Sequence, residues 1–218
     1  MTPVAATTAL DQLAAAKVLA IIRSDDAREA IALAEALASA GVGALELTFT
    51  TPGVEAALLE VKERLAGRAL LGAGTIMTPE QLKAAAGAGA DFFVSPHLDL
   101  ALLEQMLAMG GLAVPGVLTP SEVAMATRAG ATLLKLFPAA SVGHGYMRAL
   151  FGPFPGLRVL PTGGISPTTA ATWLEAGALA VGMGGELVPA ALRRARAWDE
   201  VTHFVSNFLK SLDERPSA

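Results

Sequence analysis

Two charged residues interrupt otherwise apolar stretches of the sequence. Lys135 lies in the middle of residues 132–138 (Thr-Leu-Leu-Lys-Leu-Phe-Pro), and Glu46 lies within Ala-Leu-Glu-Leu at residues 44–47. Short apolar runs bounded by Gly, Ala and Pro are typical of β-strands that are buried on both faces. A charged group is costly in such a strand, because loss of water disfavours its ionised form. Both residues are therefore candidates for chemistry.

A buried lysine can serve as a nucleophile. Loss of water lowers the pKa of an ammonium group and makes the neutral amine available at about pH 7. A neutral amine forms a Schiff base with a carbonyl substrate. The alternative for Lys135 is a place at the end of a strand, with its ammonium group in solvent. Solvation is expected for the four other lysines, which fall on expected helices or at helix ends: Lys17, Lys62, Lys83 and Lys210.

A carboxyl group close to such a lysine can act as general acid and base. Lone buried carboxylates are as disfavoured as lone buried lysines, whereas the two together can share one site. The alternative is a buried ion pair that serves only stability, but such pairs stabilise a fold little. We therefore expect Glu46 and Lys135 to meet in a functional site.

Eight apolar segments alternate with helical segments along the chain. Strands are expected over residues 18–23, 44–49, 69–75, 91–95, 112–116, 132–138, 157–161 and 178–183. Helices are expected over residues 8–17, 27–40, 51–67, 78–86, 99–109, 119–129, 146–150 and 166–176, in a further region up to about 196, and over 199–213. Thr119 and Glu122 have the spacing of a capping box. This alternation is typical of parallel βαβ units.

Eight such units favour a closed (β/α)8 TIM barrel, an α/β fold with an extra N-terminal helix and a C-terminal helix. The rival is a doubly wound open sheet, but no strand is followed by a G-x-G-x-x-G turn with an acidic residue about twenty positions later. We expect residues 1–218 to form one domain: an N-terminal helix over about 1–17, the barrel over 18–196, and a C-terminal helix and tail over 197–218.

Composition excludes several classes of partner. The net charge is −4 and there is no basic block, which argues against nucleic acid and anionic membranes as partners. There is no cysteine, and His97, His144 and His203 lack the spacing of metal ligands, so we expect no metal and no cofactor. The start of the chain lacks the pattern of a signal peptide, and no long apolar run is present. We expect a cytoplasmic protein.

In a barrel, chemistry takes place where strands end at their C-terminal face. Polar groups follow or end several expected strands here: Arg23, Thr48, Thr75, Ser95-Pro96-His97 and Thr162. His97 has either a contact with substrate or no role. Glycine pairs follow the last two expected strands, at Gly163-Gly164 and Gly184-Gly185. Backbone N–H groups at these two positions bind phosphate in many barrels, although tight turns also favour glycine.

Five ordered motifs carry a resemblance to a known family. They are Glu46-Leu47-Thr48-Phe49-Thr50, Gly72-Ala73-Gly74-Thr75, Val94-Ser95-Pro96-His97, Leu134-Lys135-Leu136-Phe137-Pro138-Ala139 and Pro161-Thr162-Gly163-Gly164-Ile165. Over about residues 8–210 the chain resembles the class I aldolases for 2-dehydro-3-deoxy-6-phosphogluconate (KDPG) and 4-hydroxy-2-oxoglutarate (KHG). The resemblance implies a (β/α)8 fold, a homotrimer without metal, and a small keto acid substrate that is cleaved to pyruvate and either glyceraldehyde 3-phosphate or glyoxylate.

The resemblance also implies roles for individual residues. Lys135 matches the Schiff-base lysine and Glu46 the general acid and base. Thr75 and Pro96 match positions that line the pyruvyl part of the substrate. Phe137 matches an aromatic residue beside the lysine, and Arg23 an arginine at the end of the first strand. Gly163, Gly164 and the Gly184-Gly185 turn match the phosphate end. Thr48 and Thr162 are included as residues of the same strand ends.

Two departures from the family pattern concern the choice of substrate. Some members carry an arginine where this chain has Thr50, and a serine where it has Gly185. Threonine suits the branch that acts on both substrates, whereas loss of the serine hydroxyl beside Glu186 weakens the case for strict preference for the phosphorylated one. An isomerase or epimerase on a phosphate-binding barrel and a non-catalytic sugar-acid-binding barrel are the competing functions, and neither needs a lysine in a strand.

Overall fold

The structure is a computed structural model that describes residues 4–214 of the 218-residue chain. Residues 1–3 of the expected N-terminal segment and 215–218 of the expected tail lie outside the described residues. The helices are α1 (Ala6–Ala16), α2 (Ala27–Ser39), α3 (Val54–Leu65), α4 (Pro79–Gly87), α5 (Leu100–Ala108), α6 (Pro120–Arg128), the 3-10 helix η1 (Ala139–Ser141), α7 (Gly143–Leu150), α8 (Ala170–Glu175), α9 (Ala190–Ala195) and α10 (Trp198–Asp213). The strands are β1 (Val18–Ile22), β2 (Ala44–Thr48), β3 (Leu70–Gly74), β4 (Phe92–Val94), β5 (Leu112–Val114), β6 (Gly116–Val117), β7 (Leu134–Leu136), β8 (Val159–Pro161) and β9 (Val181–Met183).

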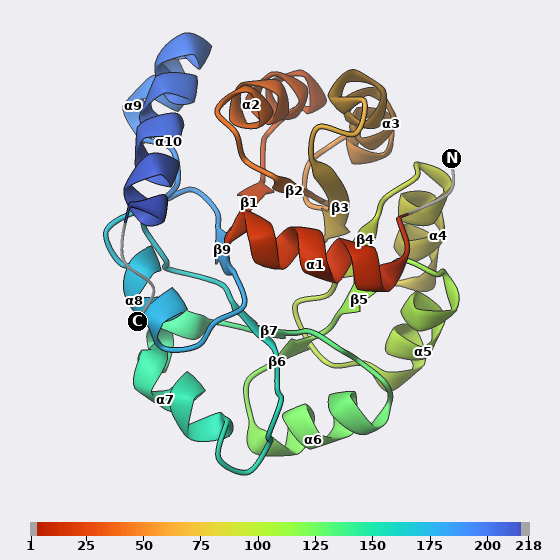
Figure 1. The fold of residues 1–218 in the computed structure, drawn as a ribbon. Coiled ribbons are helices and arrows are strands. Elements are labelled where there is room, and N and C mark those ends of the chain that lie inside the picture. The colour runs from red at the N-terminus through yellow and green to blue at the C-terminus, as the bar shows by residue number, and fades with distance from the viewer. Residues whose placement is uncertain (1–3, 215–218) are drawn as a thin grey trace.

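The strands pair in parallel, but they do not close into one barrel. One sheet has six strands in the order β5-β4-β3-β2-β1-β9, and a second sheet has three in the order β6-β7-β8. The helices surround both sheets (Figure 1). The predicted α/β class is confirmed. The predicted closed eight-stranded (β/α)8 barrel is wrong, because the structure has a six-stranded half-barrel sheet and a separate smaller sheet.

Two prolines lie where the ladders are interrupted. The expected strand over 112–116 divides at Pro115 into β5, which pairs with β4, and β6, which pairs with β7. Proline has no N–H to donate to a ladder. Pro115 supplies its carbonyl oxygen, which accepts from the backbone N–H of Lys135 at 2.9 Å. At the other break β8 ends at Pro161, and an isolated bridge between Thr162 and Gly182, rather than a ladder, links it to β9.

Side-chain caps determine where several helices begin. The side chain of Asp26 caps α2, and Thr119 and Glu122 form the predicted capping box at the start of α6. α8 begins later than the predicted residue 166. The reason is a hydrogen-bonded turn, in which the backbone N–H of Ser166 donates to Thr169 Oγ1 at 3.0 Å.

Alternate strand residues point to the inner side of the sheets, as the two-residue period of a strand requires. α1 crosses the ends at which the strands begin (Figure 1) and adds Ala9, Leu10 and Leu13 to this inner cluster. The cluster closes that end and leaves the C-terminal ends of the strands for a site. Its other buried members are Leu19, Ala44, Leu70, Phe92, Val94, Leu112, Val114, Leu133, Leu160 and Ala180.

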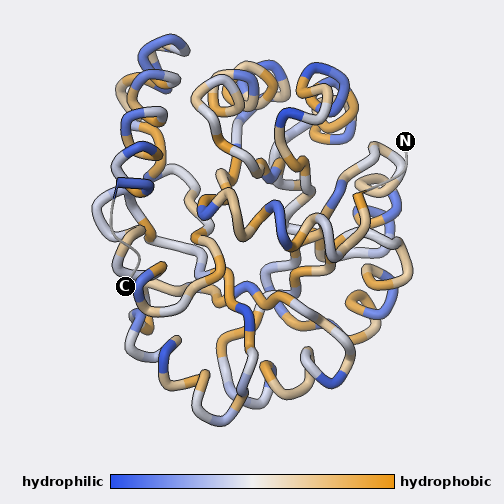
Figure 2. The backbone as a smooth tube through the Cα atoms, in the orientation of Figure 1, coloured by the Kyte–Doolittle hydropathy of each residue, from blue (hydrophilic) through white to orange (hydrophobic). Residues whose placement is uncertain are grey.

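A second and larger apolar cluster packs the helices against the outer faces of the strands. Along the helices hydrophobic and hydrophilic residues alternate, whereas the strands are mostly hydrophobic (Figure 2). α10 packs on α2, where Thr202 Oγ1 donates to the carbonyl oxygen of Ala36 at 3.1 Å. Among residues 4–214, no helix is both long and apolar enough to cross a bilayer.

The prediction that Lys62 lies in solvent is wrong. Its Nζ is 2.6 Å from Asp91 Oδ1, and the side chain of Asp91 is only 1% exposed. The same carboxylate accepts from the backbone N–H groups of Leu71 at 3.0 Å and Val4 at 3.2 Å. These bonds tie α3 and the start of the chain to the closed end of the strands, so the pairing has a structural role.

Candidate active site

A cavity of about 320 Å³ lies at the C-terminal ends of the strands. Ile21, Glu186 and Arg193 also line it, although the sequence marks none of them as site residues. Every second residue of a strand points to the same face, so Ile21 could have been predicted to face inward from its spacing to Leu19. No local sequence pattern indicates that Arg193 on α9 lines the cavity. The predicted site residues that the cavity brings together are Arg23, Glu46, Thr75, Pro96, Lys135, Phe137, Thr162, Gly163, Gly164, Gly184 and Gly185.

Three residues that the sequence analysis considers for the site do not line this cavity: Thr48, Thr50 and His97. Thr48 is fully buried, and its Oγ1 is 3.4 Å from the carbonyl oxygen of Ile22, to which it donates, and 2.9 Å from Thr50 Oγ1. These hydroxyl groups bond to each other at the end of β2 rather than to the cavity. His97 is exposed, and its carbonyl oxygen accepts from Ser95 Oγ at 2.8 Å.

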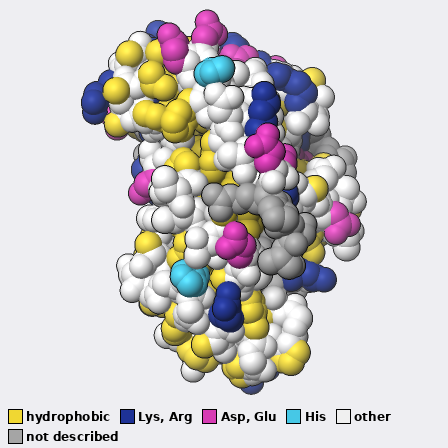
Figure 3. Space-filling view, turned by 60° about the vertical axis from the view of Figure 1, so that its left-hand side comes forward, with side chains coloured by type: hydrophobic (Ala, Val, Ile, Leu, Met, Phe, Trp, Pro, Cys, Tyr) yellow, Lys and Arg dark blue, Asp and Glu magenta, His cyan; other side chains and the backbone are white. Residues whose placement is uncertain are grey.

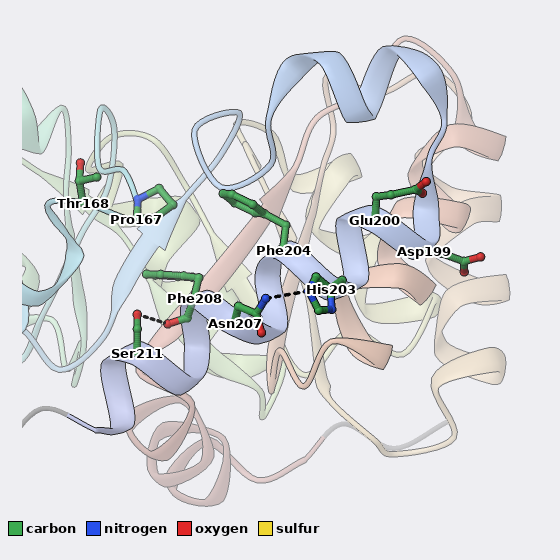
Figure 4. A pocket seen from close by; sticks show the side chains of 9 residues that line it. All are labelled: Pro167, Thr168, Asp199, Glu200, His203, Phe204, Asn207, Phe208 and Ser211. Atoms are coloured by element: carbon green, nitrogen blue, oxygen red, sulfur yellow. Dashed lines mark hydrogen bonds between the residues drawn. The ribbon is translucent and has the colours of Figure 1, made fainter.

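A larger hollow of about 730 Å³ lies elsewhere, between α10 and the turn that precedes α8. Hydrophobic side chains gather at the surface on this side of the molecule (Figure 3). Figure 4 shows Phe204 and Phe208 of α10 in this hollow, together with Pro167 and Thr168 of the turn. Two of its polar side chains, Asn207 and His203, hydrogen-bond to each other at 3.0 Å. The candidate chemistry lies in the smaller cavity.

Lys135 lies at the centre of β7, between β6 and β8. In register it faces Gly116 on one side and Leu160 on the other. The residue is only 5% exposed, and its Nζ lies 5.3 Å from the centroid of the Phe137 ring. The ladders on both sides hold the backbone of Lys135, so its side chain enters the cavity from a rigid strand.

Glu46 comes from the other sheet, where β2 lies between β1 and β3. It is 1% exposed, and neither carboxylate oxygen has a hydrogen-bond partner among the described residues. In register Glu46 pairs with Gly72 of β3. Gly74, two residues farther along the same strand, has no side chain and so leaves the space that the carboxyl group fills. A Cβ at Gly74 would lie 1.7 Å from Glu46 Oε1. The glycine is therefore required for the placement of the acid.

Burial raises the pKa of Glu46 above its ordinary value of 4.5. The positive charges of Lys135 and Arg23 act in the opposite direction, but loss of water has the larger effect. The carboxyl group of Glu46 therefore keeps its proton at pH values where an exposed glutamate is ionised. A group of this kind can donate a proton and take one back.

Thr75 lies directly after β3, with φ at 56°. This left-handed conformation is rare for a β-branched residue, and residues in it cluster at functional sites. The backbone N–H of the next residue, Ile76, donates to the carbonyl oxygen of Val94 at 3.0 Å and anchors the turn. Thr75 thus lines the cavity, as does Pro96.

The two glycine pairs differ in the space around them. Gly163 and Gly164 have φ of 96° and 73°, and a Cβ at Gly164 would lie 2.6 Å from that of Ala140. Their conformation and the close approach both require glycine. A Cβ at Gly185 would meet nothing within 4 Å, and no left-handed φ restricts it. A side chain is therefore sterically acceptable at Gly185.

A buried lysine and a buried carboxyl group of raised pKa thus line one cavity, and this pair suits an enzyme that forms an imine with a carbonyl substrate. The family model for KDPG and KHG aldolases matches residues 10–204. The 2-dehydro-3-deoxy-6-phosphogalactonate aldolase of Escherichia coli strain K12 is 31% identical over 195 residues, which cover 89% of this chain and 95% of the relative. The KHG/KDPG aldolase of the same strain is 34% identical over 197 residues, with 90% and 92% covered.

A solved structure is similar over the same range. The KDPG aldolase of Legionella pneumophila, which holds pyruvate captured at low pH as a covalent carbinolamine intermediate, superposes with a TM-score of 0.81. It is 30% identical, and the match covers 92% of this chain and 97% of that chain. This chain belongs to the KDPG and KHG aldolase family. It is an aldolase, a lyase that cleaves carbon–carbon bonds.

The space at Gly74 can be tested by Gly74→Ala. The added methyl group would displace the Glu46 carboxyl group, and we expect aldolase activity to fall about a hundredfold, as for other small misplacements of catalytic groups. Overpacking should also lower the free energy of unfolding by about 1 to 3 kcal/mol. Gly87→Ala is the control, because a Cβ there meets nothing within 4 Å. Equal activity of the two variants would refute the positional role of Gly74.

The pH dependence of stability tests the state of Glu46. Its pKa is raised from 4.5 in the folded protein, so the folded state retains a proton that the unfolded chain loses. The wild type therefore loses stability as the pH rises from 4.5 through the raised pKa of Glu46. Glu46→Gln removes this loss, so the variant should gain stability relative to the wild type across that window. Urea unfolding at a series of pH values measures the difference.

Glu29→Gln supplies a control of opposite sign. The hydrogen bond from Arg193 lowers the pKa of Glu29 below 4.5, so the contribution of Glu29 is present above 4.5 and is lost as the pH falls through the lowered pKa. This variant should lose stability relative to the wild type as the pH rises. Parallel pH profiles for the wild type and Glu46→Gln would contradict a raised pKa at Glu46.

Proposed function

We propose that this chain is a class I aldolase that cleaves KDPG to pyruvate and glyceraldehyde 3-phosphate, and KHG to pyruvate and glyoxylate. Lys135 forms the Schiff base and Glu46 transfers the protons. The observation that carries the proposal is one cavity lined by a buried lysine from one sheet and by a buried carboxyl group of raised pKa from the other. Among the described residues this carboxyl group has no hydrogen-bond partner. The names of the relatives support the choice of substrates.

The reaction begins when the neutral amine of Lys135 attacks the C2 ketone. A proton moves from nitrogen to oxygen and gives a carbinolamine. Glu46 then protonates the carbinolamine hydroxyl group, which leaves as water and gives a cationic imine. The imine cation stabilises the carboxylate that Glu46 has become, because an opposite charge nearby lowers the pKa of a carboxyl group. A raised pKa in the free enzyme is therefore what the first proton transfer needs.

Cleavage uses the same two groups. The Glu46 carboxylate takes the proton of the C4 hydroxyl group, the C3–C4 bond breaks, and its electron pair moves into the imine to give an enamine. The aldehyde leaves. Glu46 returns its proton to C3 of the enamine, and addition of water to the imine releases pyruvate and the Lys135 amine. The protonated imine is the electron sink, so this mechanism uses no cofactor.

Other cavity residues hold the substrate in this proposal. The hydroxyl group of Thr75 and the backbone beside Pro96 hold the pyruvyl carboxylate, and Phe137 packs beside the imine. Gly163 and Gly164 direct backbone N–H groups to the far end, where Gly184, Gly185 and Arg23 also lie. Thr162 also lines the cavity, directly before this glycine pair. Thr48 and Thr50 hydrogen-bond to each other at the end of β2. In this proposal they do not contact the substrate.

A homotrimer in the cytoplasm is a further prediction from the family resemblance. Large apolar side chains on the surface, such as Met77, Leu100 and Phe204, offer area for contacts between subunits. Sedimentation equilibrium should give three times the chain mass of 22.2 kDa. A monomer at micromolar concentration would contradict the trimer and leave the chemistry of the single cavity unaffected.

Borohydride reduction in the presence of pyruvate tests the proposed chemistry. We expect one reduced pyruvyl adduct per chain, located on Lys135 by peptide mass spectrometry. Lys135→Met should form no adduct and lose activity. Lys83→Met is the matched control, because Lys83 is an exposed lysine of α4 and its loss should leave both unchanged. Absence of any adduct from the wild type would favour an isomerase or a binding protein over an aldolase of this class.

A further inference from the structure

Arg193 is a cavity residue whose guanidinium group is held by two fixed partners. Its Nε donates to Glu29 Oε1 at 2.7 Å, and its Nη2 donates to the carbonyl oxygen of Arg23. Both acceptors belong to the end of β1 and the first turn of α2, which lie far from α9 in the sequence. The side chain of Arg193 is 26% exposed and that of Glu29 is 16% exposed. This is a partly desolvated pair rather than a surface contact.

The bonds leave part of the guanidinium group free. A guanidinium has five N–H donors in a planar fork, and two of them are used here. Nη1 has no acceptor among the described residues, while Arg193 lines the cavity. The hydrogen bond from Arg193 lowers the pKa of Glu29, so the carboxylate stays ionised to a lower pH and continues to accept from Nε. Arg193 is thereby held in place at the cavity, with N–H donors left over for a ligand.

The surroundings of Arg193 indicate what these donors meet. The cavity also contains Gly185, which has open space and no side chain, and the exposed carboxylate of Glu186. Glu186 repels a doubly charged phosphate and Gly185 offers it no hydroxyl group. Apart from Lys135, which is assigned to the keto group, Arg23 and Arg193 are the cationic side chains of the lining, so a bound phosphate depends on them. A planar fork matches the oxygen atoms of a phosphate monoester.

We propose that Arg193 binds the phosphate group at the end of the sugar acid remote from its keto group, and that it sets the preference of this enzyme for phosphorylated substrates. The proposal rests on the aldolase function given above and adds a specificity-determining residue to it. Glu29 is a positioning residue, because it contacts Arg193 and not the substrate. Arg193 takes the place of the missing hydroxyl group at Gly185 and offsets the charge of Glu186.

The test compares Arg193→Gln with Arg194→Gln. Arg194 is exposed on the same helix and outside the cavity, so its variant removes the same charge from α9. The substrates are KDPG and the same sugar acid without its phosphate. Arg193→Gln should lower kcat/KM for KDPG about tenfold to a hundredfold, mainly through KM, because a hydrogen bond to a charged group is lost. Its activity on the unphosphorylated acid should change less than about twofold, and Arg194→Gln should match the wild type on both.

Further variants separate binding from a structural role. Arg193→Lys keeps the charge but cannot span both partners, so its KM for KDPG should lie between those of the wild type and Arg193→Gln. Equal losses on the two substrates, or equal behaviour of the Gln variants at 193 and 194, would overturn the proposal. The pyruvate adduct on Lys135 should form fully in Arg193→Gln. Its absence from the wild type would instead refute the aldolase mechanism, so the two failures are distinguishable.

Discussion

Burial of the Glu46 carboxyl group beside the amine of Lys135 is the interaction on which the rest of the site depends. Neither carboxylate oxygen has a partner among the described residues, and loss of water raises the pKa of the group. The apolar inner cluster and α1 exclude water from below, and Gly74 provides the space. The acid thus keeps its proton to a higher pH than an exposed glutamate does, and it can release the proton once an imine cation forms nearby. Reactivity follows from an interaction that is unfavourable for folding.

The two sheets have different roles in this arrangement. Glu46 belongs to the six-stranded sheet and Lys135 to the three-stranded sheet, so the acid and the nucleophile approach each other across the inner space. The prolines that interrupt the ladders, Pro115 and Pro161, lie in or next to the smaller sheet. Even so, the carbonyl oxygen of Pro115 accepts from the N–H of Lys135 and links the end of β5 to β7. The lysine therefore stays fixed although the two sheets are not joined by continuous pairing.

Part of the fold and of the site could be predicted from the sequence, because the sequence signals for that part are local. A charged residue inside an apolar strand identifies Glu46 and Lys135, and the alternation of strands and helices identifies the α/β class. The closed barrel was a wrong prediction, since the interruption at Pro115 depends on which neighbour each half of the segment pairs with. Arg193 was missed because its orientation comes from Glu29, a contact across 164 residues. Lys62 was misplaced for a similar reason, because its partner Asp91 lies on another element.

The central claim is that one buried carboxyl group transfers the protons of the enamine that forms on Lys135. Exchange of the C3 hydrogens of pyruvate with deuterium oxide, followed by proton NMR, measures that step without an aldehyde. Glu46→Gln should still give the borohydride adduct on Lys135, although more slowly, because the carbinolamine loses water without its acid. The variant should exchange the C3 hydrogens more slowly than the wild type by about two to four decades. Exchange at the wild-type rate in this variant would show that another group moves the proton and would contradict the account.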